Sequence, residues 1–262
     1  SLIISQDYPK KKFYKREKHS AKIMGRDDRK FGDHSGNRVL CRFYNHGSIG
    51  DQSSSFSGVY PIGSGHSYIW EFSPVVAASV VDTNGFRRHI VSDGISGLVD
   101  ASPEGTPWSF EPLSGYANPN QENLAMSDNE NSWPNSWPNR TEDWNGEWNG
   151  QYGKYVRADQ ESYFVVDDRY NSEFEFWPDQ NDFPEDPTVS SDEHRRGLGI
   201  EMEARGYQWN HPAAEDIIIV TYWITNVGSS VLDSVVFGMY GDADIGGASS
   251  FSDDDAWFDT EN

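Results

Sequence analysis

The sequence predicts an all-β protein with an antiparallel, sandwich-like body and long loops rich in aromatic residues, Asn, Gly and Pro. Short stretches alternate apolar and polar residues with the two-residue period of a strand, and clusters of Gly, Pro, Asn and Asp separate them. No stretch keeps a helical period for more than two turns. Hydrophobic residues make up only 35% of the 262 residues, but aromatic residues reach 14%, and each ring adds a large apolar area to a core. The chain therefore suits one large all-β domain or two smaller ones.

Charge divides the chain into a basic N-terminal arm, predicted over residues 1–37, and a body over residues 38–262. Residues 1–43 hold twelve Lys and Arg against five Asp and Glu, a net charge of +7, whereas residues 44–262 hold nine against thirty-seven, a net −28. An acidic body repels nucleic acid and anionic lipid, so neither is an expected partner. We expect the arm to be a solvated tail or a strap on acidic surface, its own or that of another copy. The apolar anchors of such a strap would be Tyr8, Phe13, Tyr14 and Phe31.

The first strands of the body are predicted at residues 38–44, 66–72 and 75–82. The last of these leads through Thr83-Asn84-Gly85 into residues 86–91, and Asn-Gly tolerates the positive φ of a tight turn, so residues 75–91 form a predicted hairpin. The single cysteine, Cys41, alternates with polar neighbours and is expected to point inward as a small apolar residue.

Residues 92–153 form a long predicted loop region, after which strands return at 161–168, 173–177, 197–209, 216–226 and 232–240. Residues 217–224 are apolar on both faces, which is typical of a central strand. The short linker after residue 226 most simply joins 216–226 and 232–240 as an antiparallel hairpin. The phrases "CRFYNHGS" and "YWITNVGS" both end a strand in Asn-x-Gly-Ser, so two related units are an alternative to a single body.

Four tryptophans stand in the segment "NSWPNSWPNRTEDWNGEWNGQYG", where neither strand nor helix is predicted: Trp133, Trp137, Trp144 and Trp148. Flat indole faces stack on sugar rings, and the neighbouring Asn and Asp side chains suit hydroxyl groups, so these four residues are candidate ligand-stacking residues. The alternatives are packing of the loop on the sheet and contact with another protein. Because the segment has prolines and turns but no Val, Ile or Leu, we expect packing to account for most of the indoles.

A candidate calcium site lies near the C-terminal end, where Asp242-x-Asp244-x-Gly246 follows a predicted strand. Alternate aspartates on an extended turn aim carboxylates at one point, and calcium takes six to eight oxygen ligands. Further ligands are expected from Asp253, Asp254 and Asp255, with Asp259 as another candidate. The alternative is a solvated acidic loop.

Sequence motifs for catalysis are weak. The chain has no Gly-x-Ser-x-Gly, phosphate-binding or dinucleotide-binding motif and no His or Cys spacing typical of zinc, while its many carboxylates single out no catalytic pair. No stretch approaches the roughly 20 apolar residues of a membrane-spanning helix. The sequence therefore leans against an enzyme and against a membrane span.

Several phrases together resemble a family of large exported surface proteins of Bacteroidetes-related bacteria, whose members often end in a domain for type IX secretion. These phrases are "GVYPIGSGHSYIWEF", "DWNGEWNGQYGKYVRADQESYFVVDD", "RRGLGIEMEARGYQW", "EDIIIVTYWITNVGS" and "VVFGMYGDADIGG". The resemblance covers about residues 38–262, transfers no catalytic residue, and implies that more sequence follows in the full protein.

These observations favour an extracellular or cell-surface protein that is structural or adhesive and non-catalytic. Its expected partners are copies of itself or other surface proteins. The alternative is a carbohydrate-binding module, or the N-terminal part of an enzyme that acts on polysaccharide.

Overall fold

The computed structural model describes residues 28–51, 56–96, 101–103, 105, 107–179 and 195–245. Within these ranges it is nearly all β with antiparallel sheets, which confirms the predicted fold class. The strands are β1 (Phe31–His34), β2 (Cys41–Tyr44), β3 (Ile69–Val81), β4 (Arg87–Asp93), β5 (Glu111–Pro112), β6 (Ala125–Met126), β7 (Gln160–Asp167), β8 (Ile200–Gln208), β9 (Ile219–Asn226) and β10 (Asp233–Ala243). Two single-turn 3-10 helices, η2 (Glu130–Ser132) and η3 (Glu142–Trp144), lie in the long loop.

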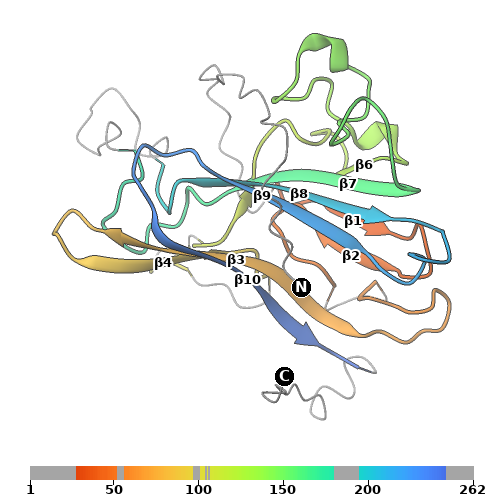
Figure 1. Ribbon diagram of the computed structural model, residues 1–262, viewed down its shortest axis with the longest axis horizontal. Coiled ribbons are helices and arrows are strands. Elements are labelled where there is room, and N and C mark those ends of the chain that lie inside the picture. The colour runs from red at the N-terminus through yellow and green to blue at the C-terminus, as the bar shows by residue number, and fades with distance from the viewer. Residues whose placement is uncertain are drawn as a thin grey trace.

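The strands form two main layers that face each other across one apolar core (Figure 1). One layer has the strand order β10-β3-β4, and the other has the order β5-β7-β8-β9 with β6 also paired to β7. The small β1-β2 sheet lies beside them. Val76 and Ile90 of the first layer and Phe164 and Met202 of the second belong to the same buried cluster. The period-two pattern of the sequence therefore directs one face of each layer inward.

The predicted hairpin over residues 75–91 is confirmed as β3 and β4, which pair from Val75↔Asp93 to Val81↔Arg87. Its loop is longer than a two-residue turn, because the Asp82 amide donates to the Phe86 carbonyl across Thr83-Asn84-Gly85. Only Gly85 in that loop has a positive φ, of 82°. The two predicted strands at 66–72 and 75–82 fuse into the single 13-residue strand β3.

The predicted hairpin between residues 216–226 and 232–240 is wrong. β9 pairs with β8, whereas β10 pairs with β3 in the other layer, so the chain crosses between the layers. The linker is attached elsewhere: the Gly228 amide donates to the Gly199 carbonyl, and the Ser230 amide donates to the Pro178 carbonyl. Those bonds replace the turn that a hairpin would need. The expectation that residues 217–224 form a central strand is also wrong for the part of the chain that the structure describes, because β9 is the last strand of its sheet there.

Two further boundaries differ from the sequence prediction. Residues 28–37, assigned to the arm, include β1, which pairs with β2 from Phe31↔Tyr44 to His34↔Cys41. This part of the chain belongs to the sheet, while residues 1–27 lie outside the described residues. Residues 173–177 form no strand, yet the Phe176 side chain still packs into the core.

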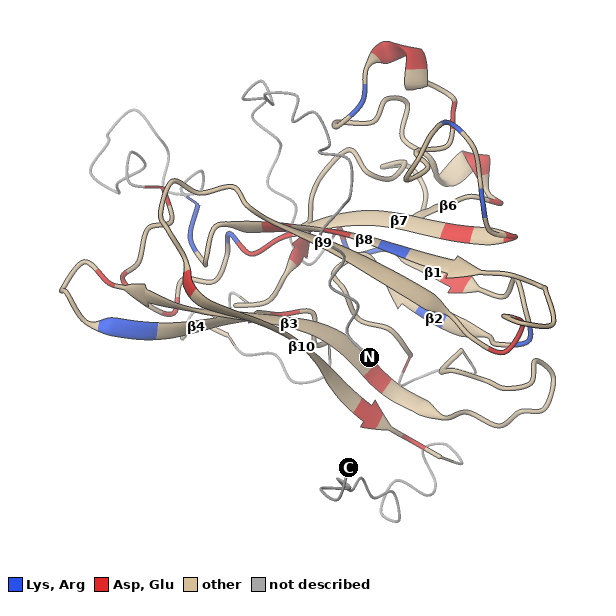
Figure 2. Ribbon diagram, in the orientation of Figure 1, with Lys and Arg blue, Asp and Glu red and all other residues tan. Residues whose placement is uncertain are grey.

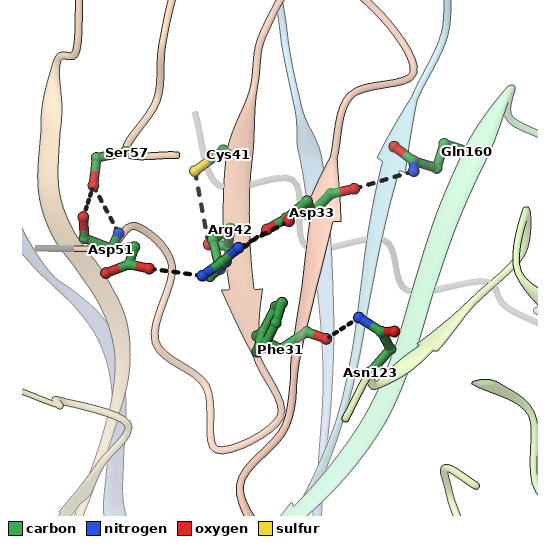
Figure 3. A network of polar contacts seen from close by, with 8 residues as sticks. All are labelled: Phe31, Asp33, Cys41, Arg42, Asp51, Ser57, Asn123 and Gln160. Carbon is green, nitrogen blue, oxygen red and sulfur yellow. Dashed lines mark hydrogen bonds and ion pairs between the residues drawn. The ribbon is translucent and has the colours of Figure 1, made fainter. Parts of the chain in front are cut away.

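A charged cluster around Arg42 joins β1, β2 and the following loop (Figure 3). The guanidinium donates to both Asp33 oxygens, at 2.7 and 2.9 Å, and to Asp51 Oδ2 at 3.0 Å. The rings of Phe31 and Phe56 lie over it at 4.0 and 4.6 Å from the guanidinium carbon. Charge-assisted bonds and cation–π contacts reinforce one another here, so Phe31 anchors the start of the sheet.

Cys41 is fully buried, as expected, and burial raises the pKa of its thiol to about 12. Such a thiol stays protonated at neutral pH and acts as a small apolar side chain.

In the described part of the chain, no helix has both the length and the apolarity that crossing a membrane requires.

Candidate functional site

We call residues 131–153, which carry the four tryptophans, the tryptophan loop. This loop packs on the outer face of the five-stranded layer, above it in Figure 1. Trp137 and Trp148 are each only 2% exposed, and Trp133 and Trp144 are partly buried. These rings form a second apolar cluster with Tyr163 and Val165 of β7. The expectation that most of the indoles pack against the body is confirmed.

The indoles hold one another and the loop backbone in place. Trp148 lies 5.4 Å from Trp133 and 6.0 Å from Trp137 between ring centroids. The Trp133 indole N–H donates to the Met126 carbonyl at 2.7 Å, and that of Trp137 donates to the Glu147 carbonyl at 2.9 Å. A buried indole is favourable when its N–H finds an acceptor, and here one acceptor is on the neighbouring strand β6 and the other is in the loop itself.

Glu161 is a buried carboxylate of β7 that the sequence did not single out, and it anchors the end of this loop. It accepts the Trp148 indole N–H at 2.7 Å and the backbone amides of Arg157 and Ala158 at 2.6 and 3.1 Å. One oxygen thereby holds loop backbone and the other holds the Trp148 indole, so the role is structural. Its position in a strand beside a tryptophan-rich loop carries no sequence signal that separates it from the other acids.

The four tryptophans do not present a shared open plane. Trp144 is partly buried, and its ring is contacted by two cations: the Arg140 guanidinium carbon lies 4.2 Å and the Lys154 ammonium 5.5 Å from its centroid. Trp137 and Trp148 have protein neighbours against their faces. The geometry brings the four predicted stacking residues together as packing residues.

The predicted calcium ligands are only partly within the described residues. Asp242 lies on β10, where its Oδ2 accepts the Tyr240 hydroxyl at 3.2 Å, and Asp244 follows the strand with its side chain buried. Asp253, Asp254 and Asp255 lie outside the described residues. Among those described, no group of three or more His, Cys, Asp and Glu side chains is placed to hold a metal ion. Calcium at Asp242 and Asp244 stays a prediction.

The carboxylate nearest to Asp242 across the sheet is already in use. Glu71 pairs with Asp242 in the β3–β10 register and is 1% exposed. Its Oε1 accepts the hydroxyls of Ser48 and Ser73 at 2.8 Å each and the Ser96 amide at 2.6 Å. One oxygen of Glu71 is therefore committed to protein donors.

Other buried titratable groups also serve the fold. Asp168 accepts the backbone amides of Leu198 and Ile200 at 2.7 and 3.0 Å, which ties the approach of β8 to the end of β7. Burial and the neighbouring Asp167 carboxylate raise the pKa of Asp168 to about 7, although those amide bonds oppose the rise. The pair of His34 Nε2 and Ser162 Oγ, 2.8 Å apart, resembles a nucleophile and its base, but both residues are 0% exposed.

At one side of the described structure, β9 ends one layer and β10 ends the other (Figure 1). The strands approach each other there, with ring centroids of Tyr222 and Phe237 5.4 Å apart. Phe237 and Met239 share a face with the buried Val76 and Pro74 of β3, yet they are 38% and 44% exposed. The core is thus incompletely covered at this side. We call β9 and β10 together the open edge.

The open edge carries almost no charge in a chain of net charge −21 (Figure 2). β9 has no Asp, Glu, Lys or Arg, and on β10 Asp233 and Asp242 flank eight uncharged residues. The other layer ends differ: β4 carries Arg87, Arg88 and Asp93, and β5 is only two residues long. Charge and shortness are usual protections of an edge strand; β9 has neither, and β10 carries charge only near its two ends, where its pairing with β3 is also irregular.

The geometry defines an antiparallel, sandwich-like β protein with a tryptophan-packed outer loop and an uncharged open edge. Comparison with known proteins adds no closer identification: no family model matches the chain, and no curated protein or solved structure matches it.

Proposed function

We propose that this protein is an exported structural or adhesive protein, non-catalytic, that assembles with copies of itself through the open edge. The observation that carries the proposal is that two long edge strands lie at the same side of the sandwich, β9 without any charged residue and β10 with eight uncharged residues between Asp233 and Asp242. A row of unpaired backbone groups on such a strand is a template for another strand. Apolar side chains beside it provide the burial that a stable contact needs.

A second copy is the occupant that the charges favour. The body is strongly acidic, so two copies repel each other over most of their surfaces. At the open edge this repulsion is weakest, because charged residues are sparse there. Charge depletion at the centre of a contact is typical of protein interfaces. Another copy brings the same uncharged strands, so one patch complements itself, as in a two-fold contact.

The test is the molar mass in solution, by size exclusion with light scattering over a wide range of concentration. We expect the wild type to exceed the 29.6 kDa of one chain. Val236→Lys, at a position on β10 that is 60% exposed, should return the mass to one chain. An exposed substitution of this kind changes folding stability by only about 0.5 kcal/mol, so the effect reports on assembly.

The matched control is Val91→Lys on β4, the opposite edge of the same layer, where Val91 is 44% exposed. It should leave the mass of the assembly unchanged. A wild type that stays monomeric at every concentration contradicts the proposal, and so does equal dissociation by the two variants. A truncation of residues 1–27 separates this contact from the predicted basic strap: if truncation alone dissolves the assembly, the arm is the contact.

Export and surface location are proposed from the composition and from the resemblance to exported surface proteins. After the arm the chain is poor in Lys and rich in Asn, Asp, Gly, Ser and Trp. Fractionation of the native source, with the protein recovered from the cell surface or medium, supports this location. Recovery only from the cell interior contradicts it.

A further inference from the structure

A second group of aromatic residues, separate from the four tryptophans, gathers where the long loop returns to the sheet. Tyr152 and Tyr155 precede β7 in the chain and are 48% and 49% exposed. Trp209 directly follows β8 and is partly exposed. Arg157 joins the three: its guanidinium carbon lies 4.4 Å from the Tyr152 ring and 5.5 Å from the Tyr155 ring, and its carbonyl accepts the Trp209 indole N–H at 3.1 Å. We call Tyr152, Tyr155 and Trp209 the aromatic platform.

Protein atoms contact one side of these rings, and part of each ring stays exposed to solvent. Trp209 stacks on the buried Tyr207 with an interplanar angle of 13° and a centroid distance of 5.7 Å. Tyr207 is fixed in turn, because its hydroxyl donates to Gln151 Oε1 at 2.8 Å. Tyr155 is held by Arg157 Nη2, which donates to its hydroxyl at 3.0 Å. The rings are therefore positioned in advance rather than freely rotating.

The backbone of this loop also fits closely around Tyr155. A Cβ on Gly153 would lie 2.5 Å from Tyr155 Cε1, and one on Gly150 would lie 2.4 Å from the Tyr155 carbonyl oxygen. Only glycine permits these approaches. The loop thus keeps an exposed aromatic ring in one place, although burying that ring would remove more apolar area from water.

We propose that the aromatic platform is a carbohydrate-binding site for a neutral polysaccharide, with sugar rings stacked on Trp209 and Tyr155. The axial C–H groups on one face of a pyranose ring suit the negative face of an aromatic ring. Such contacts favour rigid, partly exposed rings, which is how the platform differs from the buried Trp137 and Trp148.

Polar groups for sugar hydroxyls lie at the rim of the platform. The Asp159 carboxylate accepts the Asn210 backbone amide at 2.6 Å, which fixes both residues beside Trp209. Carboxylates and guanidinium groups next to an aromatic face are suited to hydroxyl donors and acceptors. An anionic polysaccharide is disfavoured by the net charge of −21, so the expected ligand is uncharged.

The experiment is native affinity electrophoresis of the full chain in gels that contain dissolved laminarin, xyloglucan, glucomannan or mannan. We expect at least one of them to retard the wild type. Trp209→Ala and Tyr155→Ala should each weaken that binding by about tenfold or more, which corresponds to about 1.4 kcal/mol. Trp209→Tyr keeps a ring at the same place and should retain most of the binding.

The matched control is Phe86→Ala, which removes an aromatic side chain that is 60% exposed at the β3–β4 loop, away from the platform in sequence. It should leave retardation unchanged. Tyr155 is half exposed, so Tyr155→Ala keeps the test valid even if Trp209→Ala fails to fold. Absence of retardation by all four polysaccharides overturns the proposal, as does undiminished binding by folded Tyr155→Ala. The molar-mass test of the open edge is independent of either result.

Discussion

Acid should weaken the fold through His34, a histidine on β1 that is 0% exposed. Its ring packs on Phe43 with centroids 4.4 Å apart, and its Nε2 lies 2.8 Å from Ser162 Oγ. A Cβ on Gly206 would lie only 2.5 Å from that nitrogen, so the site is closely packed. Burial lowers the pKa of His34 to about 4, and an interaction with the Gln208 side chain partly opposes this.

The sign and size of the effect follow from proton linkage. In the unfolded chain the imidazole takes up a proton below its ordinary pKa of 6.5, whereas in the fold it resists protonation down to about 4. The contribution of neutral His34 is therefore complete above pH 6.5 and is lost as the pH falls towards 4. A difference of about 2.5 pH units corresponds to about 3 kcal/mol of unfolding free energy, a large fraction of the stability of a typical domain.

The assay is urea unfolding, followed by tryptophan fluorescence at several pH values between about 7 and about 4. Carboxylates titrate in the same range, so the informative quantity is the difference between wild type and His34→Gln, which keeps a polar group but does not titrate. We expect the advantage of the wild type to shrink by about 3 kcal/mol on acidification. His89→Gln, at an exposed histidine of β4, is the control. A difference between wild type and His34→Gln that does not change with pH refutes the reasoning.

Two further predictions concern the tryptophan loop and the acidic turn. Trp148→Ala should lower the unfolding free energy by about 3–5 kcal/mol in urea titrations, because it empties a buried site and removes a donor to Glu161. Trp144→Ala, at a partly buried indole, should lower the unfolding free energy distinctly less. Equal losses in the two variants would contradict the packing description. If calcium binds at Asp242 and Asp244, the melting temperature should be higher with millimolar calcium than with a chelator, since binding to the folded state alone stabilises it. Asp242→Asn should remove that difference, and a melting temperature indifferent to calcium in the wild type would exclude the site.

Local patterns made much of the fold predictable. The β3–β4 hairpin follows from an apolar run, an Asn-Gly turn and a second run, all within a few residues of one another. The packing of Trp137 and Trp148 follows from composition, because a proline-limited segment without aliphatic residues has only its indoles to bury. In both cases the deciding interactions lie within the segment or between it and the nearest sheet.

Long-range choices were not predictable in the same way. Whether β10 pairs with β9 or with β3 depends on bonds from the linker to Gly199 and Pro178, which no local pattern reveals. The arm ends earlier than its charge suggests, because Arg42 of the next strand neutralises Asp33 and covers Phe31. The aromatic platform joins residues about fifty positions apart in the chain, so it becomes visible only when β8 is placed beside the loop.

The error over β9 is itself informative. Its residues are apolar on both faces, a pattern that predicts a strand with neighbours on both sides. Within the described residues, β9 has only β8 beside it, and Ile219 and Trp223 are each 41% exposed. β9 thus has the side chains of a central strand although it lies at an edge. On β10, Phe237 and Met239 likewise point towards the core and remain exposed. An edge strand that avoids pairing carries charge, as β4 does. Because β9 and the middle of β10 lack it, their sequence is better explained if assembly supplies a neighbouring strand.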